Sequence, residues 1–108
     1  MRVLDFIVDK QILTKDSKCD FTNIIPGSKG YLRAKFGLSD DWDDCIKVVE
    51  FSYGKTEYPP QRIDESNECE IPPGALKNPS FNIRVFGRRE GFEISTNKIS
   101  IDQNGGKP

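Results

Sequence analysis

Residues 81–101 read FNIRVFGRREGFEISTNKISI, and this stretch decides the fold class. Phe81, Ile83 and Val85 occupy every second position, which places them on one face of an extended strand. Residues 87–91 (GRREG) carry a glycine at each end, and glycine permits the positive φ of a tight turn. Because the alternation resumes after these residues, the stretch predicts two strands joined by a hairpin loop.

The alternation changes parity near the end of the same stretch. After the hairpin loop the inward positions are the even-numbered Phe92, Ile94 and Thr96, whereas Ile99 and Ile101 are odd-numbered. A shift of one residue turns every following side chain to the other face of a sheet. Two explanations are open: a β-bulge at residues 96–98, or a strand that leaves one sheet for the other.

Short alternating segments recur along the whole chain and are separated by turn residues, as in a β-sandwich or barrel. Leu32, Ala34 and Phe36 are expected to face inward from residues 29–38. Further strands are expected at residues 3–8, 46–51, 56–58, 61–63 and 68–71. The inward face of residues 46–51 cannot be decided from the pattern. The fold class is therefore all-β, an antiparallel sandwich of about seven strands, with at most one short helical turn near residues 73–77.

The length of 108 residues fits one domain. We assign residues 1–102 to this domain and residues 103–108, which are polar and glycine-rich, to a flexible C-terminal tail.

The charge balance and the start of the chain limit the classes of partner. The formal net charge is −1, whereas a protein that grips phosphates across a face usually has a basic excess, so nucleic acid is not an expected partner. No apolar run is long enough to span a membrane. Asp5 and Asp9 interrupt the first apolar segment, which makes it a poor signal peptide. We expect synthesis in a cytoplasm and no membrane partner.

The chain contains no histidine, which excludes Ser-His-Asp and Cys-His nucleophilic arrangements. Cys19, Cys45 and Cys69 are widely spaced and odd in number, so free and mostly buried thiols are expected instead of disulfides or a zinc site. Glu68 and Glu70 share one exposed face of an expected strand, where solvated carboxylates are the rule. We therefore expect no enzyme activity, no cofactor and no metal site.

Two charged segments and several aromatic residues are candidates for a partner interface. The segment at residues 40–44 is acidic, although it lacks the glycine and glutamate of a helix-loop-helix calcium site. The segment around residues 84–89 is basic, and arginine suits carboxylate partners. We consider that the two segments complement each other in a head-to-tail contact. The candidate residues are Asp40, Asp41, Asp43, Asp44, Arg84, Phe86, Arg88, Arg89, Tyr53 and Tyr58.

The chain resembles a group of small virion structural proteins encoded by phages and prophages of Gram-positive bacteria. The matching segments are residues 3–8 (VLDFIV), 30–36 (GYLRAKF), Trp42 with 47–51 (KVVEF), 69–72 (CEIP) and 87–92 (GRREGF) with Ile94, Thr96 and Asn97. The likeness extends to about Gln103 and consists of strand and turn patterns. The resemblance implies an immunoglobulin-like sandwich carried on a virus particle.

From this resemblance the expected function is a capsid decoration protein that binds the major capsid protein on the outside of the head shell. Self-association on the particle is possible in such a lattice. The alternatives are a connector in a tail, baseplate or fibre, where the partner is another virion protein, and a surface or carbohydrate-binding module. The chain ends soon after its last expected strand, which favours decoration over an adaptor.

Overall fold

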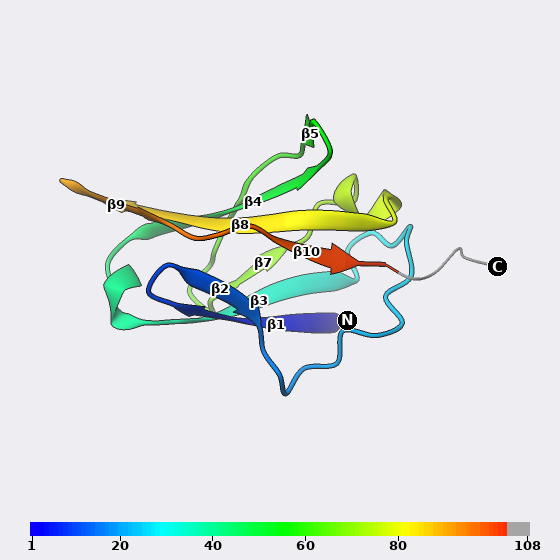
Figure 1. Cartoon of the computed structure of the whole chain (residues 1–108), viewed down its shortest axis with the longest axis horizontal. Helices are drawn as coiled ribbons and strands as arrows, with labels where there is room; N and C mark the ends of the chain where they lie inside the picture. Colours follow the sequence, from blue (N-terminus) through cyan, green and yellow to red (C-terminus); the bar gives the residue numbers. More distant parts are fainter. Residues whose placement is uncertain (104–108) are drawn as a thin grey trace.

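The computed structural model of the chain describes residues 1–103 and has two stacked β-sheets (Figure 1). The first sheet has the strand order β2-β1-β3-β7. Its strands are β1 (Arg2–Asp9), β2 (Ile12–Lys15), β3 (Leu32–Leu38) and β7 (Glu68–Glu70). β1 and β2 form a hairpin whose turn includes Lys10 at φ 58°, and β1 pairs with β3 in parallel.

The second sheet is built around the long strand β8 (Ser80–Arg89). One edge of β8 pairs with β4 (Ile46–Tyr53), which in turn pairs with the short strands β5 (Thr56–Glu57) and β6 (Gln61–Arg62). The other edge pairs first with β9 (Phe92–Ser95) and then with β10 (Ile99–Asp102).

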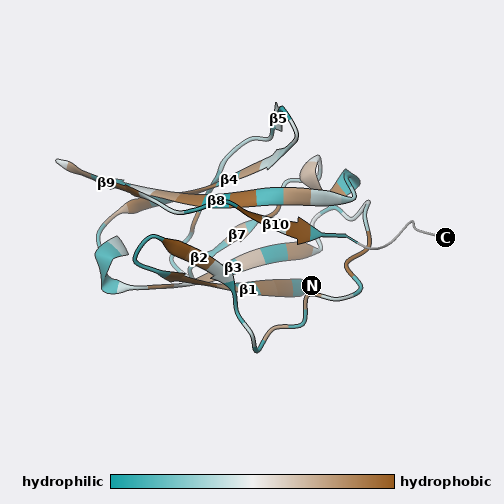
Figure 2. Ribbon diagram, viewed as in Figure 1, coloured by the Kyte–Doolittle hydropathy of each residue, from teal (hydrophilic) through white to brown (hydrophobic). Residues whose placement is uncertain are grey.

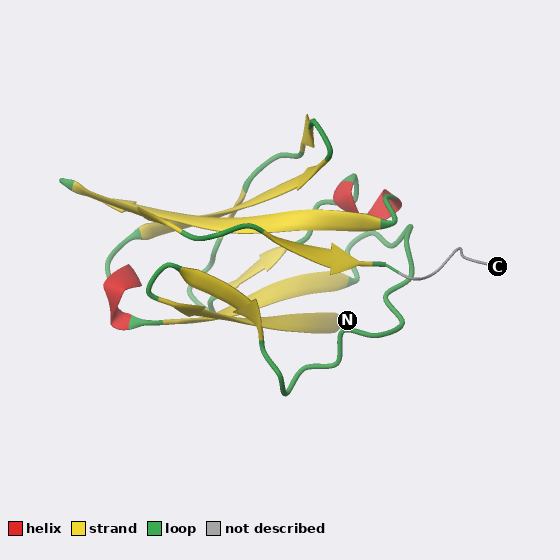
Figure 3. Cartoon of the chain, in the orientation of Figure 1, coloured by secondary structure: helices red, strands yellow, loops and turns green. Residues whose placement is uncertain are grey.

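Two short 3₁₀ turns lie at opposite ends of the sandwich (Figure 3). η1 (Asp40–Trp42) leads from β3 in the first sheet to β4 in the second, and η2 (Ala75–Lys77) precedes β8. The sequence predicts the second turn but not the first, so the expectation of at most one helical turn is wrong. Burial of Trp42 explains the difference, because a turn at residues 40–42 brings its ring inward.

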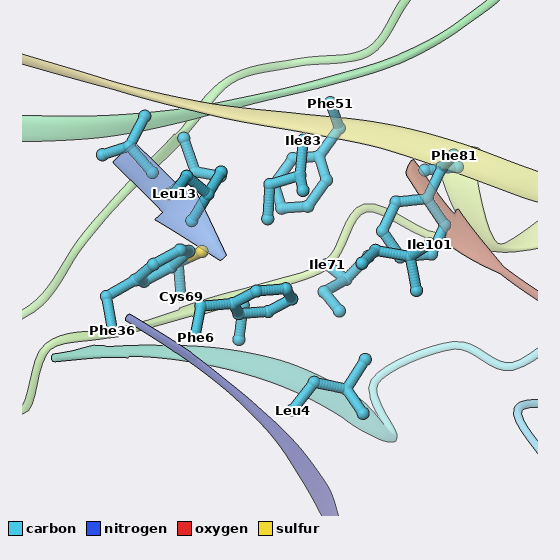
Figure 4. Close-up of a cluster of buried hydrophobic side chains, with 14 of the residues drawn as sticks. Leu4, Phe6, Leu13, Phe36, Phe51, Cys69, Ile71, Phe81, Ile83 and Ile101 are labelled. Atoms are coloured by element: carbon cyan, nitrogen blue, oxygen red, sulfur yellow. The ribbon is translucent and has the colours of Figure 1, made fainter. Parts of the chain in front are cut away.

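The core is formed by apolar side chains that alternate along both sheets (Figure 2). Leu4, Phe6 and Phe36 come from the first sheet, and they face Phe51 and Ile83 of the second (Figure 4). All of these side chains are at most 1% exposed. The inward face of β4, which the pattern left open, carries Val49 and Phe51. Full burial of each such side chain contributes about 1.5–3 kcal/mol.

The parity change is explained by a bulge at residues 96–98. β9 and β10 pair with the same strand, β8, but the pairing shifts by one residue between them: Ser95 lies opposite Phe86, whereas Ile99 lies opposite Ile83. The first of the two open explanations is therefore confirmed, and the chain does not change sheets. The Thr96 hydroxyl accepts a hydrogen bond from the Val85 amide at 3.0 Å and so closes the gap in the ladder.

The extra residue of the bulge links the two sheets. The Asn97 side-chain oxygen accepts a hydrogen bond from the Leu13 amide at 2.7 Å, and its nitrogen donates to the Leu13 carbonyl at 3.2 Å. One amide side chain thus pairs with the free edge of β2 as a neighbouring strand would. This satisfies backbone groups of the fully buried Leu13 that no other strand reaches.

Trp42 closes one end of the sandwich. Its side chain is 0% exposed, and its Nε1 donates a hydrogen bond to the Lys10 carbonyl at 2.8 Å. The ring lies so close to Gly87 that a Cβ added there would be 2.8 Å from two ring carbons. Gly87 therefore belongs to β8, and the expectation that it begins the hairpin loop is wrong. Only Gly91 has the positive φ of the turn, at 70°.

The all-β sandwich is confirmed, but three details differ from the sequence analysis. Residues 1–103 contain ten strands instead of about seven, one strand pair among them is parallel, and β2 is a strand that the pattern did not predict. The immunoglobulin-like assignment stays a prediction. Gln103, assigned to the flexible tail, is 2% exposed and donates a hydrogen bond from Nε2 to the Asn78 carbonyl at 2.8 Å. Residues 104–108 of that tail lie outside the described residues.

The three cysteines are free, as the sequence predicts. Cys45 and Cys69 are buried, and Cys19 is half-buried. Burial raises the pKa of the Cys69 thiol to about 12. This thiol is therefore protonated and unreactive near neutral pH, and it packs as a small apolar side chain.

Within residues 1–103, no helix has the length and apolar character needed to cross a bilayer.

Removing the Asn97 amide should loosen the contact between the bulge and β2. Asn97→Ala leaves the Leu13 amide and carbonyl without their partners, and we expect a loss of about 1–2 kcal/mol in the free energy of unfolding. Urea denaturation measures this loss. Asn97→Asp is the second variant. It keeps the acceptor for the Leu13 amide but places a carboxylate oxygen against the Leu13 carbonyl, so it should also be less stable than the wild type. Equal stability of all three proteins would contradict this role.

Candidate functional site

The β8–β9 hairpin extends beyond the rest of the sandwich at one end of the molecule (Figure 1). Arg88 pairs with Glu93 and Arg89 with Phe92 on either side of the turn at Gly91. A hairpin end that protrudes from two packed sheets is accessible from several sides. It is also the place where the sequence analysis located most of the basic candidates.

Arg89 ties this hairpin to the acidic segment of the same chain. Its Nη1 donates to the Asp43 carbonyl at 3.0 Å and lies 3.3 Å from the Cys45 Sγ. Its guanidinium also stacks on Phe92, 3.8 Å from the ring centroid. The basic and acidic segments therefore meet within one molecule, and the arginine contacts backbone carbonyls there. For Arg89 this geometry provides a structural role, in which it holds the base of the hairpin.

Arg88 differs from Arg89 in its surroundings. It lies on the outer face of the second sheet, exposed, opposite Ile46 of β4. Ile46 is 53% exposed, a large value for an isoleucine within a paired strand. Arg88 also lies opposite Glu93 of β9. An exposed apolar side chain beside charged residues is typical of a contact surface, where an apolar centre is surrounded by polar groups.

Two grooves lie on the sides of the hairpin, and both include Phe92 and Glu93. The first has a volume of about 520 Å³ and is bordered by Ile46, Arg88 and Arg89. The second has a volume of about 360 Å³ and lies between β9 and the β1–β2 turn, with Lys10, Gln11 and Asp41 on its other wall. We call the residues that border these two grooves the hairpin surface. Its members are Lys10, Gln11, Asp41, Ile46, Arg88, Arg89, Glu90, Gly91, Phe92, Glu93 and Ile94.

The remaining candidates do not join the hairpin surface. Tyr53 is 38% exposed at the far end of β4. Tyr58 is half-buried: its ring covers Gly74, and its hydroxyl accepts a hydrogen bond from the Asn78 Nδ2 at 2.8 Å. The other members of the sequence-based set, Asp40, Asp43, Asp44, Arg84 and Phe86, lie beside the surface or on the outer face of the second sheet.

Sequence reasoning missed Ile46, Phe92 and Glu93 as surface residues. The alternation places Phe92 inward with the core, but in the structure its ring is half-buried and is covered by the Arg89 guanidinium. A signal for Ile46 existed, since it has the opposite parity to Val49 and Phe51. The parity of Ile46 indicates an outward side chain only when the inward face of β4 is known.

Of the two strand carboxylates considered for other chemistry, Glu70 is exposed and Glu68 has a local partner. Glu68 accepts a hydrogen bond from the Arg33 Nε at 3.0 Å, and Asp64 lies 3.1 Å from the Nη2 of the same guanidinium. The hydrogen bond with Glu68 raises the pKa of Arg33. Among residues 1–103, no group of three or more acidic residues, cysteines or histidines converges on a point where a metal ion would fit.

Comparison of the chain with protein-family models, with curated proteins and with solved structures gave no match in any of the three.

The two neighbouring arginines of the hairpin should respond differently to the same substitution. Arg89→Gln removes the hydrogen bond to the Asp43 carbonyl and the stacking on Phe92, so we expect a loss of about 1–2 kcal/mol in the free energy of unfolding. Arg88→Gln is the matched control and should change stability by less than about 0.5 kcal/mol, as exposed substitutions do. Thermal and urea unfolding measure both. Similar losses in the two variants would contradict the separate roles.

Proposed function

We propose that this chain is a non-enzymatic structural protein of a phage virion, a decoration protein that docks on the outer surface of the capsid through the hairpin surface. The observation that carries the proposal is the projecting β8–β9 hairpin, with grooves on both of its sides and an exposed Ile46 beside the Arg88–Glu93 pair. The sequence resemblance to virion proteins supplies the kind of assembly.

The geometry of the hairpin suits binding to a repeated protein surface. Specific protein contacts bury about 800 Å² on each partner. The described chain has an accessible surface of 6608 Å², so such a contact occupies roughly one eighth of it. Ile46 supplies the apolar centre of the contact on the outer face of the hairpin, and Arg88 and Glu93, which share that face, supply the polar rim together with Glu90.

Each such contact is small, but many copies of it together stabilise the particle. A ligand that binds the assembled state and not the disassembled one stabilises the assembled state by mass action. A decoration protein that occupies every equivalent site on a shell adds this modest stabilisation many times.

A connector in a tail, baseplate or fibre uses the same kind of surface and differs only in its partner, so it remains the alternative. The carbohydrate-binding alternative needs a row of exposed aromatic residues on one sheet face. The exposed tyrosines are Tyr31, which precedes β3 of the first sheet, and Tyr53, which lies in β4 of the second sheet. This arrangement does not favour an aromatic platform.

The test is co-sedimentation of the purified chain with empty capsids of the phage or prophage that encodes it. We expect saturable binding at a copy number that matches the capsomers or the capsid subunits. Failure to bind capsids would contradict decoration, and binding to purified tails instead would support the connector.

A pair of isoleucine variants tests the docking surface. Ile46→Asp places a charge at the apolar centre of the hairpin surface and should lower capsid affinity by about tenfold or more. Ile12→Asp is the matched control, since Ile12 is 57% exposed on β2, similar to the 53% of Ile46, but lies outside the hairpin surface. Equal binding by both variants would place the docking surface elsewhere.

A further inference from the structure

Strand β10 has one edge without a partner strand. It stands at the end of the second sheet and pairs only with β8. The Gln103 amide continues this pairing and donates a hydrogen bond to the Pro79 carbonyl at 2.7 Å. Because bonded residues alternate along an antiparallel pair, the odd-numbered residues of β10 point their backbone groups toward β8. The N–H and C=O groups of Ser100 and Asp102 therefore point away from β8.

These outward backbone groups are accessible. Ser100 and Asp102 are both exposed, and no part of the chain passes in front of β10 in Figure 1. Within residues 1–103, no backbone group outside β8 forms a hydrogen bond with either residue. The neighbouring edge, that of β2, is closed by the side chain of Asn97. The edge of β10 is open, and an open edge is a template for a further strand.

The sequence at this edge is complementary to itself. Residues 98–102 read KISID, with opposite charges at the two ends and an isoleucine on each side of Ser100. If two copies pair antiparallel about Ser100, Lys98 of each copy lies opposite Asp102 of the other, and Ile99 lies opposite Ile101. Opposite charges and apolar side chains that face each other stabilise an antiparallel pair. Pairing centred on Lys98 or on Asp102 instead places like charges opposite each other.

Both charges of this edge are available for such a pair. Lys98 and Asp102 are exposed, and among residues 1–103 neither forms an ion pair within 4.0 Å. The register of β10 sets Lys98 beside Arg84 of β8, so its neighbour on that side is a like charge. A lysine at an edge normally opposes the addition of a strand. Here it disfavours most strands and favours one that brings a carboxylate to the same position, as a second copy of β10 does.

We propose that β10 pairs with β10 of a second copy of this chain, so that the second sheet continues from one molecule into the other across a twofold axis at Ser100. The two Ser100 residues exchange backbone hydrogen bonds, and Asp102 and Lys98 form ion pairs on either side of them. The contact is isologous, since each copy contributes the same residues. It lies on a different strand from the hairpin surface and does not depend on capsid docking.

The first test is the oligomeric state of the full chain in solution. A contact of a few residues from each copy is smaller than a standard interface, so we expect a weak dimer with a Kd of about 0.1–1 mM. Sedimentation equilibrium from about 10 μM to about 1 mM protein measures it, and the amide shifts that change with concentration should centre on residues 98–102. A chain that stays monomeric, or shifts that centre elsewhere, would overturn the proposal. Ile46→Asp should dimerise like the wild type, and loss of the dimer in this variant would assign the contact to the hairpin surface instead.

Charge-swapped variants test the register. Lys98→Glu and Asp102→Lys each place like charges opposite each other in both halves of the contact, so each should weaken the dimer at least about tenfold. The double variant restores opposite charges and should dimerise like the wild type. An equimolar mixture of the two single variants should form a heterodimer, because every facing pair is then opposite in charge. Failure of both the double variant and the mixture to recover would rule out this register.

Proline at the axis tests the backbone pairing. Ser100→Pro removes an N–H that points away from β8, and an edge strand tolerates proline at such a position, so the monomer should keep its fold while the dimer is lost. Ser100→Ala is the matched control, since it keeps the N–H and should dimerise like the wild type. A folded proline variant that still dimerises would show that the strands do not pair. The charge-swapped variants decide the case if the proline variant does not fold.

Discussion

The packing of Trp42 against Gly87 is the constraint on which the rest of the structure depends. The indole contacts the strand that leads into the projecting hairpin, and its Nε1 holds the carbonyl of Lys10 in the β1–β2 turn. The Trp42 side chain therefore joins the second sheet to the first at the end of the sandwich that carries the hairpin. Close packing of this kind tolerates little change in volume, which explains why a residue without a Cβ stands near the end of β8. Arg89 extends the same junction by binding the carbonyl of Asp43, so the hairpin emerges from a fixed base.

Much of the fold could be predicted from the sequence, because alternation reports which side chains are buried. The alternation at residues 81–101 located β8, β9 and β10, and the parity change located the bulge. β2 escaped prediction because only Leu13 of its four residues is buried and its turn relies on Lys10 with a positive φ. The parallel pairing of β1 with β3 was not predictable, since alternation is the same in parallel and antiparallel strands. The role of Gly87 depends on a tryptophan 45 positions away in the chain, which no local pattern reports.

The candidate surface was predictable only in part, because a local sequence pattern does not report contacts between residues that are distant in the chain. The charge pattern identified Arg88 and Arg89, but only the structure separates the arginine that contacts its own chain from the one that is free. Ile46 and Phe92 belong to strands, and the apolar residues of a strand are assigned to the core until its end is seen to project. The position of Lys98 beside Arg84 on the outer face was also hidden, because it depends on the register of the bulge.

Hydrogen–deuterium exchange of Gly87→Ala, with Gly37→Ala as its control, tests the central role of the Trp42–Gly87 packing most directly. At position 87 a new Cβ meets the indole at 2.8 Å, whereas at position 37 the nearest atom, the Cδ1 of Ile7, is at 3.4 Å. We predict that Gly87→Ala accelerates exchange together in two segments distant in sequence, residues 86–95 and residues 9–13, while Gly37→Ala leaves both unchanged. Acceleration confined to the hairpin, or an equal effect of the two variants, would contradict the account, because Trp42 would then not couple the hairpin to the first sheet.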